Sequence, residues 1–168
     1  KAAYHFDYRE MIRREGLDAV VISSPHALHY EQVRRALQVG LHVLVEKPLT
    51  LSSRQNRALL ALAKKRKRVL MVSYQRHYHA SFLYSQELIR KGTLGDLRGV
   101  VGYVTQDWLG VGGWRLNPQL SGGGMFMDTG SHLVAVILWM TGLIPTEVSA
   151  FVEHLKEGID IITVLTVR

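Results

Sequence analysis

The sequence contains no cysteine among its 168 residues, which excludes disulfide bonds and thiolate chemistry but leaves the redox compartment open. Long apolar runs are also missing. The longest, Leu133–Met140, is far below the roughly 20 residues that cross a bilayer. The first seven residues, Lys-Ala-Ala-Tyr-His-Phe-Asp, lack the apolar core of a signal peptide. We therefore expect a soluble, cytoplasmic protein without a membrane partner.

The charge balance is basic, with 21 Lys and Arg against 14 Asp and Glu and a formal net charge of +7. Five of the basic residues form one run, Lys64–Arg68, at the predicted end of a helix. Cationic side chains there complement the helix dipole and keep the surface hydrated. We favour this interpretation over a nucleic-acid-binding patch, which would give salt-sensitive DNA affinity.

The first 74 residues alternate between short apolar strands and helices. Residues 18–23 contain a continuous rather than alternating apolar run, Ala19–Ile22, which is typical of a parallel strand covered on both faces. Ser52 with Gln55 resembles a capping box that opens a helix. The same pattern predicts a helix at 8–15 and strands at 42–45 and 69–72. Strands and helices in this alternation predict an α/β fold with a doubly wound parallel sheet.

After Tyr74 the pattern changes. It predicts a helix at 80–91, a strand at 97–106, a long loop at 107–124, a buried helix at 129–141 and strands at 147–152 and 161–167. The longer strands indicate a second sheet of a different kind, and loops as long as the predicted one are usually functional or mobile. We therefore expect two domains, 1–74 and 75–168.

Glu46-Lys47-Pro48 directly follows a predicted parallel strand. In open doubly wound sheets, ligands bind in the crevice outside the carboxyl ends of the strands. Lys47 could therefore donate to a substrate oxygen. The alternative is a surface charge pair followed by a helix-starting proline, and the tripeptide alone does not decide between them.

Asp128 and His132 are four residues apart, after Gly122-Gly123-Gly124. If the helix begins at or before Asp128, this spacing places both side chains on one face. A carboxylate beside an imidazole orients the ring and raises its basicity. Alternatively Asp128 is an N-cap and His132 a satisfied core histidine, and the spacing taken alone favours this second interpretation.

A metal site is not expected. His77 and His79 form a His-x-His pair, but no cysteine accompanies them and no third ligand is defined.

Five segments resemble the glucose-fructose oxidoreductase and inositol dehydrogenase family (Gfo/Idh/MocA). They are Asp18–His29, Gly40–Leu49, Leu88–Gly95, Trp114-Arg115 and Gly122–His132. Each is weak alone, but five in the right order along nearly the whole chain make the resemblance specific. It implies part of a Rossmann dinucleotide-binding domain over 1–74. Over 75–168 it implies part of an α+β domain with an open, mostly antiparallel sheet that binds substrate and mediates oligomerisation.

The resemblance also implies an NAD- or NADP-dependent oxidoreductase acting on a sugar, polyol or related hydroxyl compound, homo-oligomeric and without a nucleic-acid partner. Lys47, Asp128 and His132 match the family's catalytic residues, with His132 as the general base. Positions that match contacts to the cofactor are Ser24, Pro25, His29, Glu46, Trp114 and Arg115.

Three departures from the family pattern qualify this. The chain contains no Gly-x-Gly-x-x-Gly turn and no acidic residue placed to bind the adenosine ribose. His26 stands where the family has asparagine, and Ala135 where it has aspartate. The sequence also stops at Arg168, where the family would be expected to continue with further strands. We therefore expect an internal fragment of such a protein, inactive by itself. The alternative is a non-catalytic sugar- or cofactor-binding regulatory protein on the same scaffold.

Overall fold

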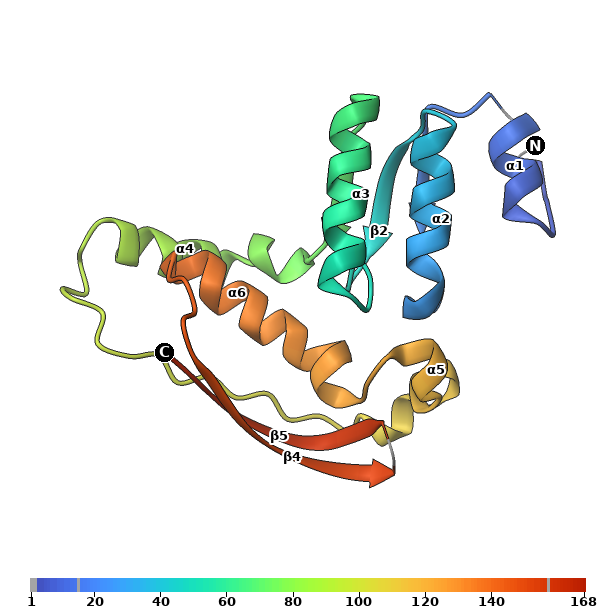
Figure 1. Cartoon of the computed structure of the whole chain (residues 1–168). Coiled ribbons are helices and arrows are strands. Elements are labelled where there is room, and N and C mark those ends of the chain that lie inside the picture. The colour runs from blue at the N-terminus through green and yellow to red at the C-terminus, as the bar shows by residue number, and fades with distance from the viewer. Residues whose placement is uncertain (1–2, 15, 157) are drawn as a thin grey trace. The chain divides into compact units, whose positions relative to one another are not determined.

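The computed structural model describes residues 3–14, 16–156 and 158–168. The chain divides into two compact units, Lys1–Ser73 and Tyr74–Arg168 (Figure 1). Each unit has its own sheet, parallel in the first and antiparallel in the second.

The first unit alternates helices with parallel strands. Strand order is β1-β2-β3, so each crossover leads to the neighbouring strand. This confirms the expected Rossmann-like arrangement. Its elements are α1 (Tyr8–Arg14), β1 (Ala19–Ile22), α2 (His26–Gln38), β2 (His42–Glu46), α3 (Ser53–Arg66) and β3 (Leu70–Ser73).

The core of this unit lies on one face of the sheet. Val20 and Ile22 of β1 are buried with residues of α2 and α3, including Leu37 and Leu59. On the opposite face, by contrast, Val21 of β1 is 74% exposed. The continuous apolar run predicted cover on both faces, and the described residues cover only one. The sequence pattern shows that both faces of the strand carry apolar side chains, but it does not show which segments pack against each face.

The start of α3 differs from the predicted capping box. The Ser52 side chain makes no cap hydrogen bond. Instead the hydroxyl of Thr50 accepts from the Ser52 N–H at 3.1 Å and lies 2.8 Å from Oδ1 of Asn56. A threonine two residues earlier therefore orders this turn, which the Ser-x-x-Gln spacing could not reveal.

The basic run closes α3. Lys64, Lys65 and Arg66 form its last turn, where cations complement the helix dipole. Lys67 then adopts the left-handed conformation, with φ of 53°. Arg68 turns back, and its Nε donates to the carbonyl of Gly40. These contacts match the predicted helix end.

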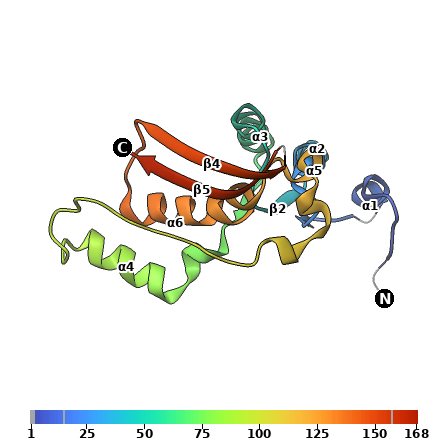
Figure 2. The ribbon, with the colours of Figure 1, turned by 90° about the horizontal axis from the view of Figure 1, so that it is seen from below.

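The second unit is built around α6 (Figure 2). Helix α4 packs against α6, and the Gln86 amide donates to the Trp139 carbonyl at 3.2 Å. Strands β4 and β5 form an antiparallel hairpin alongside α6. The elements are η1 (Gln75–Tyr78), α4 (Ala80–Arg90), η2 (Leu109–Val111), η3 (Gly113–Leu116), α5 (Pro118–Ser121), η4 (Phe126–Gly130), α6 (Ser131–Thr141), β4 (Val148–Lys156) and β5 (Ile159–Val167).

The strand predicted at 97–106 is wrong. All ten residues are described, and none is in a strand. Gly102 lies against α6 instead, where a Cβ would come within 3.1 Å of Leu133 and Ile137 side-chain atoms. An apolar pattern indicates which side chains can be buried, but a strand also needs a neighbouring backbone to pair with.

The helical segment that ends with α6 begins earlier than the pattern predicted, because the π-helical turn Phe126–Gly130 precedes α6 without a break. Asp128 therefore lies inside the helical segment, and the interpretation of Asp128 as an N-cap is wrong. π-helical turns occur frequently at functional sites.

Pairing between β4 and β5 is irregular at one end of the hairpin. Glu153 pairs with Ile162, but the next residue, His154, pairs with Asp160. This bulge leaves two consecutive residues of β5 buried, Ile159 at 0% and Asp160 at 9% exposure. Neighbouring residues of a regular strand point to opposite faces, so the bulge re-aims Asp160.

Across the described part of the chain, no helix combines the length and apolar character that crossing a membrane requires.

Candidate functional site

The turns that follow β1 and β2 are joined by one buried side chain. His29 of α2 is fully buried, with Nδ1 2.8 Å from the Pro48 carbonyl and Nε2 2.9 Å from the Ser24 carbonyl. A neutral imidazole has one N–H and donates to one of these oxygens, whereas an imidazolium donates to both. His29 therefore holds together the two turns where ligand contacts were predicted.

The predicted residues of these turns lie at the carboxyl ends of their strands. Glu46 is the last residue of β2, and Lys47 follows with its N–H donating to Oε2 of Glu46 at 3.3 Å. The Lys47–Pro48 peptide bond is cis. Pro25 precedes α2, and the Ser24 hydroxyl contacts Oε1 of Gln32 at 2.5 Å.

These residues fit one end of a dinucleotide. Carboxyl ends of parallel strands form the ligand crevice of a doubly wound sheet. A hydroxyl, a carboxylate and an ammonium group, from Ser24, Glu46 and Lys47, can hydrogen-bond a carboxamide and ribose hydroxyls. The set contains no glycine-rich turn for a pyrophosphate. Contact of these residues with the nicotinamide half stays a prediction.

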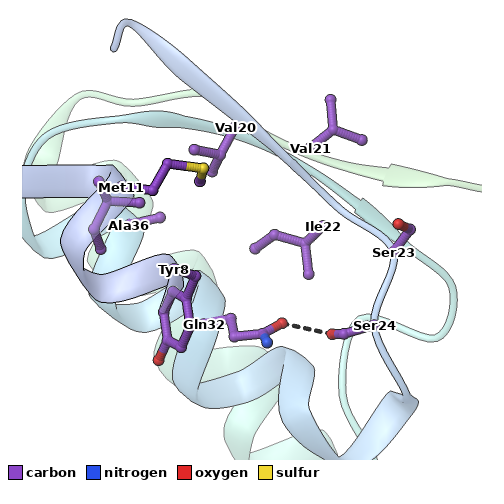
Figure 3. A pocket seen from close by; sticks show the side chains of 10 residues that line it. Tyr8, Met11, Val20, Val21, Ile22, Ser23, Ser24, Gln32 and Ala36 are labelled. Atoms are coloured by element: carbon purple, nitrogen blue, oxygen red, sulfur yellow. Dashed lines mark hydrogen bonds between the residues drawn. The ribbon is translucent and has the colours of Figure 1, made fainter. Parts of the chain in front are cut away.

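A hollow of about 330 Å³ lies beside β1, which is an edge strand of the described sheet (Figure 3). Apolar side chains from α1, β1 and α2, among them Met11, Ile22 and Ala36, line most of it. The Ser24–Gln32 pair closes one side, and Ser24 is the only predicted site residue in the lining. The hollow thus lies beside an apolar strand and borders the turn after β1 through Ser24.

In the second unit, Asp128 is held by two donors on one oxygen. Trp108 Nε1 donates to Oδ2 at 3.0 Å and Arg115 Nε donates to the same atom at 3.1 Å. Trp108 is 3% exposed, so its indole is fixed by the surrounding structure. Charge-assisted hydrogen bonds of this kind are about twice as strong as neutral ones. The carboxylate of Asp128 is therefore firmly oriented.

His132 follows in the first turn of α6 and is 5% exposed. Its ring packs against the Tyr74 ring in a T-shaped contact, with the ring centroids 5.6 Å apart and the planes at 82°. Burial raises the pKa of Tyr74 above its ordinary value of 10.0, against a smaller lowering by a hydrogen bond with the Ser131 side chain. Tyr74 therefore presents a neutral phenol beside the predicted base.

Trp114 and Arg115 form a pair. The guanidinium carbon of Arg115 lies 4.7 Å from the centre of the Trp114 ring, a cation–π arrangement. Arg115 also donates to Asp128 and so helps to orient that carboxylate. The predicted cofactor contact of both residues stays a prediction.

The structure thus gathers the predicted residues into two groups, one in each unit. His77 and His79 belong to neither group, and His77 stacks on Trp139 with ring centroids 4.9 Å apart. Among the residues that the structure describes, no three His, Asp or Glu side chains are clustered as metal ligands.

Comparison with protein families decides the relationship. Residues 2–74 match the oxidoreductase family with an NAD-binding Rossmann fold, and residues 82–168 match the GFO/IDH/MocA C-terminal domain. The chain belongs to the Gfo/Idh/MocA family. Its first unit is therefore part of an NAD-binding domain.

Individual members of the Gfo/Idh/MocA family are similar along most of the chain. A dTDP-3,4-didehydro-2,6-dideoxy-alpha-D-glucose 3-reductase from Streptomyces antibioticus is 34% identical over 135 residues, which are 80% of this chain and 41% of that protein. Crystal structures that match include aldose-aldose oxidoreductase from Caulobacter crescentus with glycerol (28% identity, TM-score 0.80, 95% of this chain and 49% of that one). Another is GenD2 from gentamicin A biosynthesis with NAD (26% identity, TM-score 0.82, 99% of this chain and 48% of that one). The chain spans about two fifths of the length of such curated relatives.

Three residues around Asp128 and His132 were not predicted from the sequence. Trp108 and Tyr74 contact Asp128 and His132, and Asp160 binds the turn that precedes them. A tryptophan in the long loop at 107–124 was a usable signal for Trp108. No local pattern marks Tyr74 or Asp160, because their partners lie far away in the sequence.

Proposed function

We propose that a protein carrying this chain is an NAD(P)-dependent oxidoreductase that moves a hydride between nicotinamide and a hydroxyl or carbonyl group of a sugar, polyol or related compound. Support comes from membership of an oxidoreductase family and from relatives named as sugar reductases and oxidoreductases. The observation that carries the proposal is Asp128, fixed by Trp108 and Arg115 on the helical segment that continues into His132.

In the proposed reaction, His132 accepts the proton of the substrate hydroxyl, as a general base. Asp128 orients the imidazole and stabilises the imidazolium that forms. Lys47 stabilises the negative charge that develops on the alkoxide oxygen. When NAD is bound, its nicotinamide ring takes up the hydride from the same carbon.

The remaining predicted residues have binding roles in this proposal. Ser24, Pro25 and Glu46 contact the nicotinamide half, with His29 behind them. Trp114 and Arg115 border the substrate and cofactor, and Arg115 forms an ion pair with Asp128. Self-association of the complete protein, proposed here from family membership, would involve the unit that contains β4 and β5.

Ala135 suggests a substrate that is less hydroxylated than inositol or glucose. One turn beyond His132, it lacks the side-chain acceptor that the family's aspartate would offer to a substrate hydroxyl. We propose that the substrate lacks one hydroxyl, or carries a bulkier group, at that position. A dideoxysugar, the substrate class named for the Streptomyces antibioticus relative, is of this kind.

The test is NAD and NADP reduction by the complete protein over a panel of sugars, polyols and deoxysugars. His132→Ala and Lys47→Ala should each lower turnover by about 100-fold or more, the scale of lost acid–base or oxyanion stabilisation. Matched controls are His79→Ala and Lys65→Ala, which remove an exposed histidine and an exposed lysine and should leave turnover unchanged. Cofactor binding without turnover on any substrate would instead identify a non-catalytic binding protein.

A further inference from the structure

The helical segment that carries Asp128 and His132 begins where an ordinary N-cap cannot be placed. Helices usually start with a Ser, Thr, Asp or Asn side chain that accepts from the first free N–H groups. Here Gly122–Gly124 precede the segment. A Cβ at Gly124 would lie 2.0 Å from the carbonyl oxygen of Asp160, because the backbone of β5 passes directly against it. No side chain fits at Gly124, and Met125, which follows it, makes no side-chain cap hydrogen bond.

Asp160 supplies the acceptor from β5. Its Oδ1 accepts from the Gly124 N–H at 2.7 Å, and its Oδ2 accepts from the Phe126 N–H at 2.6 Å. The hydroxyl of Thr163 adds a longer contact to Oδ2, at 3.4 Å. A carboxylate in this place also interacts favourably with the helix dipole. One buried side chain therefore caps the helix from 34 and 36 residues away.

A single residue, Gly124, links the cap to Asp128 by hydrogen bonds. Gly124 is bound to Asp160 through its N–H, and its carbonyl accepts from the N–H of Asp128 at 3.1 Å. The bulge in the hairpin aims Asp160 at this turn. Movement of the turn along or around the helix axis would displace Asp128 together with its contacts to Trp108 and Arg115.

We propose that Asp160 is a positioning residue, which fixes the turn carrying Asp128 and thereby the Asp128–His132 pair for proton transfer. This inference rests on the proposed function of that pair. The carboxylate acts through main-chain N–H groups and touches neither substrate nor cofactor.

Asp160→Asn in the complete protein tests the proposal. The amide keeps the size of the side chain but has one acceptor oxygen, so either Gly124 or Phe126 loses its partner. We expect kcat to fall by about 10-fold or more, because small displacements of reacting groups are costly. KM for NAD should stay within about twofold, since the cofactor contacts proposed at the strand-end turns are in the first unit. Glu153→Gln, which makes the same charge change at an exposed position of β4, should alter neither parameter.

Hydrogen exchange gives a readout that does not depend on turnover. In the unsubstituted protein the amide protons of Gly124 and Phe126 should be protected, and in Asp160→Asn at least one should exchange faster. Exchange of both in the unsubstituted protein as fast as at exposed Gly113 would show that the cap does not form, and would overturn the proposal even if the variant cannot be purified. A variant in which kcat is unchanged, or in which KM for NAD rises in step with the loss of kcat, would also overturn it. A complete protein without NAD-dependent turnover would refute the proposed function, while the exchange measurement would still decide whether the cap exists.

Discussion

Replacing His29 is expected to lower the stability of the first unit, because one buried main-chain carbonyl would lose its hydrogen-bond donor. His29→Leu keeps a side chain of similar size in a fully buried position but removes both ring nitrogens near the Ser24 and Pro48 carbonyls. A buried acceptor that loses its donor costs about 1–3 kcal/mol. Taking about 2 kcal/mol, and about 4–8 °C per kcal/mol for a domain of this size, the unfolding midpoint should fall by about 8–16 °C.

Two amide variants show which carbonyl matters. The amide nitrogen of Asn approximates Nδ1 of the ring, which faces the Pro48 carbonyl, and that of Gln approximates Nε2, which faces the Ser24 carbonyl. The variant that keeps the working donor should retain most of the stability in thermal and urea unfolding followed by circular dichroism. If His29→Leu is within about 0.5 kcal/mol of the parent, the scale of an ordinary surface substitution, the hydrogen bonds do not hold the turns together and the reasoning is wrong.

Four other outcomes are expected. Trp108→Phe removes the indole donor to Asp128 and should lower turnover of the complete protein by about 10-fold without changing KM for NAD; equal activity would show that this donor is dispensable. Because burial raises the pKa of Tyr74, the folded state binds the phenol proton more tightly than the unfolded state does. The resulting stability is fully present below pH 10.0 and is lost as the pH rises above it. In Tyr74→Phe the free energy of unfolding, measured at alkaline pH, should therefore depend less on pH. Gly124→Ala should destabilise the protein by about 3 kcal/mol or more, because its Cβ would overlap the β5 backbone, whereas Gly99→Ala has open space and should be near neutral in the same urea titration. Calorimetry of the 168-residue chain with NAD should detect no tight binding, since the sequence contains no glycine-rich pyrophosphate turn, and a dissociation constant in the low micromolar range would contradict this.

Local patterns in the sequence were sufficient for much of the fold. The runs that became β1 and β2 were recognisable because parallel strands are short, apolar and separated by helices. The spacing of Asp128 and His132 allowed a shared helix face but alone favoured an N-cap at Asp128, and the structure instead places both residues in one continuous helical segment. Residues 97–106 show the limit, since their apolar pattern could not supply a partner strand.

The supporting contacts could not be predicted because they join distant parts of the chain. Trp108 and Asp128 are 20 residues apart, and Asp160 and Gly124 are 36 apart. Such pairs depend on how a loop and a hairpin pack on α6, which periodicity does not encode. The capping box predicted at Ser52 is wrong for a local reason, because Thr50, two residues earlier, accepts the hydrogen bond at this turn instead.

The bulge at the end of the β4–β5 hairpin constrains the number of residues that this hairpin can contain. Hairpin tips usually tolerate insertions and deletions, since they are exposed and free of packing. In this hairpin, adding or removing one residue between Asp160 and Ile162 would exchange the faces of the strand. The buried places of Ile159 and Asp160 would then pass to their neighbours, and the glycine turn would meet an apolar side chain instead of a carboxylate. We therefore expect natural variants and engineered insertions to change this hairpin in composition far more readily than in length.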